Sequence, residues 1–309
     1  MPRFALATVI AVVLVAAGCG GSTTKTSPPT TATRSASNSL LQGKTWLKVA
    51  RIGSLPLAFS KAAAVALPHG RLMVLGGYTG AGSLDTILAG PPGRLRAIGH
   101  LPQPTHDAAA AVLGGSVYLF GGGESVSRPS VVRVDPRNGS ATQAPSLGEP
   151  LSDLGAVAIG GHAYLVGGYT GTQFATAIFR YRPAATIARL PTGTRYAGVA
   201  AIGRTIYVAG GLTTAGATSA VYAVSLSGGL RRIATLPALE DHAGLAALGG
   251  RLYLVSGRRV LAIDPKSRKV TVAARLPVSL SDPTATTVGN QIIVTGGGTN
   301  GVWSLEPTT

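Results

Sequence analysis

The segment RLMVLGG (71–77) decides the fold, because it is a short apolar strand that ends in two glycines and the pattern recurs along the chain. It returns as SVYLFGG (116–122), HAYLVGG (162–168), TIYVAGG (205–211), RLYLVSG (251–257) and QIIVTGG (291–297). Successive doublets are 45, 46, 43, 46 and 40 residues apart. Six repeats of this length are typical of the four-stranded blades of a β-propeller.

The fifteen residues before each doublet align without a gap as a polar pair, a run of small residues, a turn and the apolar strand. The small residues, such as those at 108–111 and 243–247, are predicted to form the innermost strands. Blades converge there on the central axis, and only small side chains fit between them. Three positions before the doublet, one side chain per repeat is predicted to pack between blades. These core residues are Met73, Tyr118, Tyr164, Tyr207, Tyr253 and Ile293.

A third and a fourth strand follow each doublet, as in SVVRVDP (130–136) and the later endings in Leu-Pro. The last repeat stops one strand short at GVWSLEPTT (301–309), whereas TWLKVARIGSLP (45–56) has the fourth-strand pattern and precedes the first repeat. We therefore expect an all-β, six-bladed propeller over 45–309 in which the N-terminal strand completes the last blade and removes an exposed edge.

The strand with its glycine doublet, the Asp-Pro after the third strand and the period of 40 to 46 residues resemble Kelch repeats over residues 45–309. Two features depart from that pattern. The fourth-strand Trp is missing from most repeats, with Trp46 the one candidate, and Ser256 replaces a doublet glycine. The resemblance implies a Kelch-type propeller, an architecture shared by binding modules and sugar-acting enzymes, so it does not decide the function.

The N-terminus predicts export. Residues 1–18 combine Arg3 with a short apolar run, as a signal peptide does, and the small residues before Cys19 resemble the bacterial lipobox. The alternative is an ordinary cleaved signal in which Cys19 is incidental. Residues 19–44 then comprise a lipidated, palmitate-type Cys19 and a flexible tether rich in Ser, Thr, Pro and Gly. We expect a lipid-anchored protein of the bacterial cell envelope, on the outer face of the cytoplasmic membrane.

The chain is strongly basic, with 27 Lys and Arg against 11 Asp and Glu and a net charge of +16. This charge suits a protein beside anionic lipid headgroups, and the alternative is an anionic cell-envelope polymer as partner. The basic residues are dispersed and are not interleaved with aromatic ones, which argues against nucleic acid. Because Cys19 is the one cysteine, no thiol remains for a disulfide, metal ligation or nucleophilic catalysis, and we expect no metal and no cofactor.

A polar pair precedes the innermost strand of each repeat, and the topology of a propeller brings these pairs together around the mouth of the channel. The first repeat contributes Lys61 before Ala62, and the sixth contributes Asp282 after Ser281. The predicted ligand-binding rim comprises Lys61, His106, Asp107, Asp153, Arg195, Tyr196, Asp241, His242 and Asp282. One interpretation is that each pair caps its own turn. The other is a mixed-charge cup, with Lys61 and Arg195 holding anionic groups and the Asp and His residues accepting hydroxyls.

Two functions remain open. The first is a non-catalytic recognition module that binds a protein or a glycan through this rim, with no catalytic residue. The second is a sugar-active enzyme, such as a sialic-acid-mutarotase-like epimerase, in which Asp107 with His106, or Asp241 with His242, moves a proton. Neither the oligomeric state nor the ligand follows from the residues.

Overall fold

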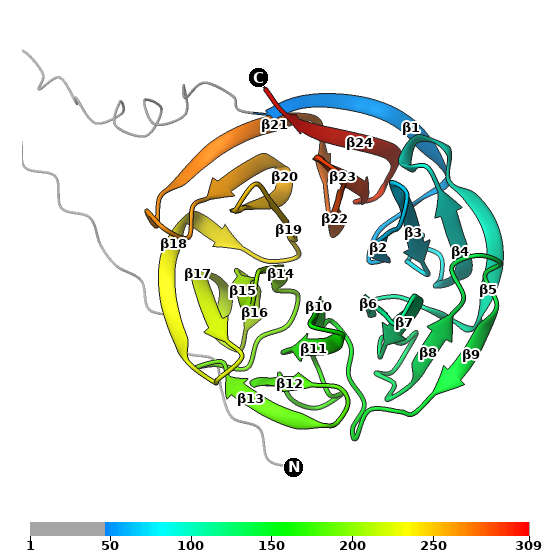
Figure 1. Ribbon diagram of the computed structural model, residues 1–309, viewed down its shortest axis with the longest axis horizontal. Coiled ribbons are helices and arrows are strands. Elements are labelled where there is room, and N and C mark those ends of the chain that lie inside the picture. Colours follow the sequence, from blue (N-terminus) through cyan, green and yellow to red (C-terminus); the bar gives the residue numbers. More distant parts are fainter. Residues whose placement is uncertain (1–46, 309) are drawn as a thin grey trace, which may run out of the picture. The chain divides into compact units, whose positions relative to one another are not determined.

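Six β-sheets surround a central axis in the computed structural model, which describes residues 47–308 (Figure 1). The innermost strands β2, β6, β10, β14, β19 and β22 lie nearest the axis, and later strands of each blade lie farther out. The 3-10 turn η2 (Pro92–Arg94) precedes the outermost strand of the first blade. This arrangement confirms the all-β, six-bladed propeller.

Each blade is an antiparallel sheet whose strands follow the chain outward. Blades 1 and 2 contain β2 (Ala63–Leu67), β3 (Arg71–Leu75), β4 (Leu84–Gly90), β5 (Arg96–Thr105), β6 (Ala109–Leu113), β7 (Ser116–Phe120), β8 (Val131–Val134) and β9 (Ala141–Ala144). Blades 3 and 4 contain β10 (Gly155–Ile159), β11 (His162–Val166), β12 (Ala177–Arg180), β13 (Ala185–Arg189), β14 (Gly198–Ile202), β15 (Thr205–Ala209), β16 (Leu212–Thr213), β17 (Gly216–Ser225) and β18 (Leu230–Glu240). Blades 5 and 6 contain β19 (Gly244–Leu248), β20 (Arg251–Ile263), β21 (Val270–Leu280), β22 (Pro283–Val288), β23 (Gln291–Gly296) and β24 (Thr299–Pro307).

The ring is closed by β1 (Leu47–Phe59), which pairs antiparallel with β24 as the outermost strand of blade 6 (Figure 1). The register begins with Leu47 opposite Pro307 and Lys48 opposite Glu306. The two ends of the propeller are thus joined by a β-ladder, as predicted from residues 45–56. Thr45 and the Kelch-type candidate Trp46 lie outside the described residues.

The hydrophobic core is divided into six clusters, each shared by two neighbouring blades. Between blades 1 and 2, for example, Met73 and Leu75 pack with Val117 and Leu119. The predicted packing position is fully buried in all repeats except the second, where Tyr118 is half-buried and stacks on Phe120 with ring centroids 6.3 Å apart. Because every cluster needs two blades, the blades stabilise one another around the closed ring.

Blade 5 shows the structure at the repeat in which Ser256 replaces a glycine of the doublet. In this blade the second and third strands are one continuous element, β20, which pairs with β19 along its first half and with β21 along its second. The other blades insert a loop at this point, at 76–83, 121–130, 167–176 and 210–215, and blade 6 inserts Gly297 and Gly298. The rim of the propeller is therefore high over blades 1 to 4 and low over blades 5 and 6.

The glycine doublets hold the crossing segments, which we define as the stretches that lead from the outermost strand of one blade to the innermost strand of the next. The second glycine donates its N–H to the last carbonyl of the outermost strand, as Gly77 does to Thr105 at 2.9 Å, or to a residue near that strand's end, as Gly122 does to Leu151 at 2.8 Å. The first glycine adopts a positive φ, +61° for Gly121, and a Cβ there would overlap the Leu151 carbonyl oxygen. The doublet is thus required by close backbone approach as well as by φ.

The predicted signal peptide (1–18), the lipidation of Cys19 and the tether (19–44) lie outside the described residues. Within 47–308, no helix is long and apolar enough to cross a membrane.

Alanine substitutions at two glycines can separate the stability cost of a positive φ from the cost of close backbone contact at a crossing segment. Gly114 also has a positive φ, +56°, but nothing lies within 4 Å of its Cβ position. We expect Gly114→Ala to cost about 1 kcal/mol of unfolding free energy and Gly121→Ala about 3 kcal/mol or more, since overpacking against backbone is added. Chemical denaturation of both variants measures this difference. Equal losses would show that the doublet serves φ alone.

Candidate functional site

Six residues that lie just before the innermost strands share an uncommon backbone conformation. Each has a φ between 52° and 57°, in the left-handed region that L-residues seldom adopt. They come one from each blade: Lys61, Asp107, Asp153, Tyr196, His242 and Asp282. We call them the mouth residues, because they all line the mouth of the central channel.

The first repeat differs from its gap-free alignment. Lys61, and not Ala62, has the left-handed conformation, and Ser60 pairs with Tyr78 as His106 pairs with Gly123 in the next blade. The predicted pair Lys61 and Ala62 is therefore wrong by one position, and the pair is Ser60 and Lys61. The cause is an extra residue in the turn between β2 and β3, where residues 68–70 replace the two glycines of other repeats.

Backbone hydrogen bonds connect the mouth residues from blade to blade. Lys61 N–H donates to the carbonyl of Asp282 at 3.3 Å, and Asp107 N–H donates to that of Lys61 at 3.0 Å. The series continues from Asp153 to Asp107 at 2.7 Å and from Tyr196 to Asp153 at 2.9 Å. Each of these side chains therefore has a fixed backbone origin at the channel mouth, independent of the loops above it.

Asp107 and Asp153 form a buried carboxyl pair at the centre of the site. The side chain of Asp153 is 2% exposed and that of Asp107 10%. Burial, the charge of Asp153 and a side-chain hydrogen bond with it raise the pKa of Asp107 to about 7, although Lys61 opposes the shift. At neutral pH the Asp107 carboxyl is therefore poised between its protonated and ionised forms, and the protonated form can donate a hydrogen bond to Asp153.

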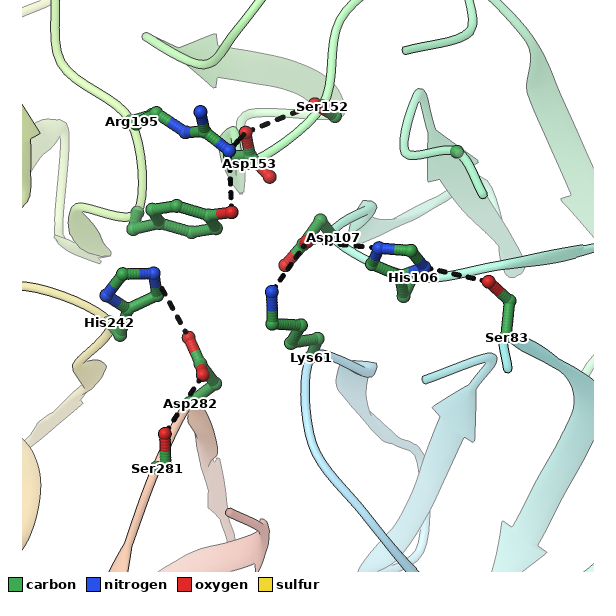
Figure 2. Close-up of polar contacts among 12 residues, drawn as sticks. Lys61, Ser83, His106, Asp107, Ser152, Asp153, Arg195, His242, Ser281 and Asp282 are labelled. Carbon is green, nitrogen blue, oxygen red and sulfur yellow. Dashed lines mark hydrogen bonds and ion pairs between the residues drawn. The ribbon is translucent and has the colours of Figure 1, made fainter. Parts of the chain in front are cut away.

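Lys61 and His106 flank Asp107 on the side of blades 1 and 2 (Figure 2). Lys61 Nζ lies 3.4 Å from Asp107 Oδ2, and His106 Nε2 lies 3.5 Å from the same oxygen. The other ring nitrogen of His106, Nδ1, lies 2.8 Å from Ser83 Oγ. Burial, followed by the charge of Lys61, lowers the pKa of His106, so its imidazole is neutral near pH 7.

Arg195 is held rigidly against Asp153 by ionic and aromatic contacts. Its Nη2 lies 2.6 Å from Asp153 Oδ2 and donates to Tyr196 Oη at 2.6 Å. The guanidinium carbon lies 4.4 Å from the ring centroid of Tyr196, 4.7 Å from that of Tyr169 and 5.4 Å from that of Phe174. These cation–π contacts fix the guanidinium plane within an aromatic cage.

His242 completes the ring of side chains on the side of blades 5 and 6 (Figure 2). Its imidazole lies against the Tyr196 ring with centroids 3.8 Å apart, and its Nε2 is 3.6 Å from Asp282 Oδ1. Ser281 Oγ donates to the other oxygen of Asp282 at 3.2 Å. Burial raises the pKa of Asp282 and of Tyr196, and the nearby carboxylates raise the latter further.

Two cavities lie over these residues. The larger, about 460 Å³, lies over blades 1 to 4 and is walled by the loops 123–127 and 169–172 of blades 2 and 3. The smaller, about 130 Å³, descends between the six mouth residues into the channel. Together they form a polar cup, which we call the cup, of the size that small ligands occupy. Its wall is low toward blades 5 and 6.

The structure brings together eight of the nine predicted rim residues. Asp241 is the exception, because it lines neither cavity and its half-exposed carboxylate lies 3.5 Å from His242 Nδ1. The residues that the sequence analysis missed lie in the loops after the doublets. They are Tyr78, Ser83, Ser127, Tyr169 and Phe174.

One sequence signal could have identified part of this missed set. The motif GGYTG occurs twice, at 76–80 and 167–171, and both tyrosines face the cup residues. Tyr78 lies 5.1 Å from the His106 ring, and Tyr169 lies over Arg195. Among residues 47–308, no group of three or more His, Cys, Asp or Glu side chains could hold a metal ion.

The left-handed mouth positions generate a stability prediction at Lys61. We expect Lys61→Gly to be more stable than Lys61→Ala by about 1 kcal/mol, because both variants lose the ion pair with Asp107 and only Gly relieves the positive φ. Thermal and denaturant unfolding of the two variants measure the difference. The prediction fails if Ala equals or exceeds Gly.

Asp107 also generates a pH dependence of stability. Its folded pKa of about 7 lies above the ordinary value of 3.8, so between about pH 4 and 7 the folded protein keeps a proton that the unfolded chain has released. The unfolding free energy therefore falls as pH rises through this window, by about 1.4 kcal/mol per pH unit at most.

The variant Asp107→Asn isolates this contribution, since Asn does not titrate while His106 and Asp282 still do. We expect the stability of wild type relative to Asp107→Asn to fall between pH 4 and 7 and then level. Denaturant titrations across pH 4 to 8 measure both profiles, and parallel profiles would refute the assignment.

Comparisons with known proteins support the fold and leave the activity open. No protein-family model matches the chain, and no curated protein matches its sequence. A solved structure described as the structure of YjhT superposes with a TM-score of 0.71 at 15% sequence identity, covering 82% of this chain and 95% of the other. Since 880 chains of solved structures match, the likeness shows an architecture that many proteins share. The chain is thus similar to YjhT in its fold.

Proposed function

We propose that this protein is a Kelch-type lipoprotein of the bacterial cell envelope that binds a glycan in the cup. The observation that carries the proposal is the set of six mouth residues. A left-handed conformation is least costly for Gly, and the chain contains 43 glycines, yet all six positions carry charged or aromatic side chains. Backbone strain of this kind, repeated around one cavity, points to selection for a binding surface.

The size and shape of the cup favour a glycan over a folded protein partner. A cavity of about 460 Å³ accommodates one or two sugar rings, and its walls enclose them on the side of blades 1 to 4. The low wall at blades 5 and 6 leaves an exit for the remainder of a longer chain. We therefore propose that the cup takes the end of a glycan whose other units extend over blades 5 and 6.

The charges of the cup favour a ligand that is recognised through its hydroxyl groups. Lys61 and Arg195, predicted to hold anionic groups, already contact the carboxylates of Asp107 and Asp153. A ligand carboxylate would have to compete with these buried acids. Hydroxyls, in contrast, can donate to Asp107 and accept from Lys61 or Arg195 without breaking either ion pair. Tyr169 and Tyr196 offer aromatic surface beside these groups for the apolar face of a sugar ring.

A sugar-active enzyme is the second candidate, and the Asp107 site favours it specifically. A carboxyl with a pKa of about 7 next to an ionised partner and a neutral imidazole can both give and accept a proton at neutral pH. Such a group could protonate a ring oxygen and remove the proton of an anomeric hydroxyl, which is the proton exchange that ring opening needs. The sialic-acid-mutarotase-like epimerase that the sequence leaves open is of this class.

Glycan binding can be tested with a pair of matched aspartates. Wild type is screened against cell-wall glycan fragments and sialic-type sugars, and the affinity of any ligand is then measured by calorimetry for Asp107→Ala and Asp241→Ala. We expect Asp107→Ala to weaken binding about tenfold to a hundredfold, because a hydrogen bond to a charged group is lost. Asp241→Ala, on the same rim but outside both cavities, should bind as wild type does.

Several outcomes distinguish the candidates. If no glycan in the screen binds, or if both variants weaken binding equally, the cup is not the glycan site. If wild type interconverts the bound sugar's anomers and Asp107→Ala abolishes that turnover with its melting temperature retained, the protein is an enzyme and not a binding module alone.

A further inference from the structure

The face opposite the cup carries a series of exposed cations. We call it the turn face, because it consists of the turns between first and second strands and between third and fourth strands of each blade. Exposed cations occupy these turns in five blades: Arg94, Arg137, Arg182, Arg204, and the triplet Lys266, Arg268 and Lys269. Neighbouring blades thus present cations around the whole perimeter of the face except at blade 6.

The acidic residues have the opposite distribution. Of the chain's 11 Asp and Glu, three lie at the turn face, and the other eight (11 − 3) lie at the cup end of their blades. One of the three is ion-paired, one caps a turn, and one lies opposite a lysine. Asp135 is paired with Arg137 at 2.6 Å, Asp264 accepts backbone N–H bonds from Lys266 and Ser267, and Glu306 lies opposite Lys48 in the β1–β24 ladder.

Four cations at the cup end are, in contrast, paired with those acids. Arg128 lies 3.8 Å from Glu124, Arg259 is paired with the buried Glu240, and Lys61 and Arg195 are paired with the mouth carboxylates. The protein is therefore electrostatically polarised along the propeller axis, with a mixed-charge cup face and a strongly basic turn face.

The chain joins the propeller on the basic side. β24 runs from the rim toward the turn face and ends at Pro307, and Leu47 pairs with Pro307 at the start of β1. Leu47, the first described residue, therefore lies at the turn face. The lipid anchor predicted at Cys19 and the basic face at the start of β1 both favour a membrane as the neighbouring surface.

We propose that the turn face docks on a bilayer that contains anionic lipids, so that the cup faces away from the membrane. Each Lys or Arg near an anionic surface contributes about 1 kcal/mol at low ionic strength, which is about fivefold in affinity. The turns present these cations on one face, as a flat lipid surface requires. This docking does not depend on the ligand of the cup.

The proposal is tested with the chain from residue 19 onward, carrying Cys19→Ser so that no lipid can be attached. Flotation with phosphatidylcholine vesicles, with and without 30 mol% phosphatidylglycerol, measures binding at about 50 and 300 mM salt. We expect binding to the anionic vesicles alone and its loss at high salt. The triple variant Lys266→Gln, Arg268→Gln, Lys269→Gln should bind roughly a hundredfold more weakly.

A matched triple variant separates the turn face from net charge. Arg189→Gln, Arg258→Gln and Arg275→Gln remove three exposed cations away from the turn face and should weaken vesicle binding less than about threefold. Melting temperatures verify that both variants are folded. Equal losses in the two triples, or no binding to anionic vesicles at 50 mM salt, would overturn the proposal. Binding to soluble poly-glutamate but not to vesicles would overturn it in favour of a polymeric anion.

Discussion

The crossing segment between blades is the constraint on which both the ring and the cup depend. At the second blade, Thr105 accepts the N–H of Gly77, His106 pairs in both directions with Gly123, and Asp107 donates to the carbonyl of Lys61. Residues 105–107 are thus hydrogen-bonded to the preceding blade, the following blade and the adjacent mouth residue. These ties hold Asp107 in its left-handed conformation, which an isolated chain would seldom adopt.

This arrangement explains why a site can be built at the centre of a repetitive fold. The apolar clusters between blades stabilise the ring, and they do so with residues that alternate away from the mouth. The mouth positions are therefore free to carry any side chain that tolerates the local φ. Blades 2, 3 and 6 carry Asp, blade 1 carries Lys, and blades 4 and 5 carry Tyr and His, so a symmetric backbone supports an asymmetric set of groups.

The sequence predicts the ring well because the repeat signal is local to each blade. A strand, a glycine doublet and a turn recur at a fixed period, and the missing fourth strand of the last repeat could be matched to residues 45–56. The side-chain contacts of the cup are not local in this sense. Lys61 meets Asp107 across 46 residues, and the pairing of Arg195 with Asp153 joins two blades. Whether a cation near an acid is paired or open to a ligand depends on side-chain directions that the repeat pattern does not specify.

Small changes in loop length account for the other differences between pattern and structure. The extra residue in the β2–β3 turn shifts the mouth position from Ala62 to Lys61, because strand pairing fixes the ends of β2 and leaves the turn to absorb the insertion. In blade 5 the loss of the loop after Ser256 lowers the rim without disturbing the ladder. The change in blade 5 acts on the cup face, whereas the extra residue of the β2–β3 turn lies on the opposite face and leaves the mouth position of Lys61 in place. The propeller thus separates its two surfaces: loop length shapes the cup, and the residues of short turns determine the potential of the turn face.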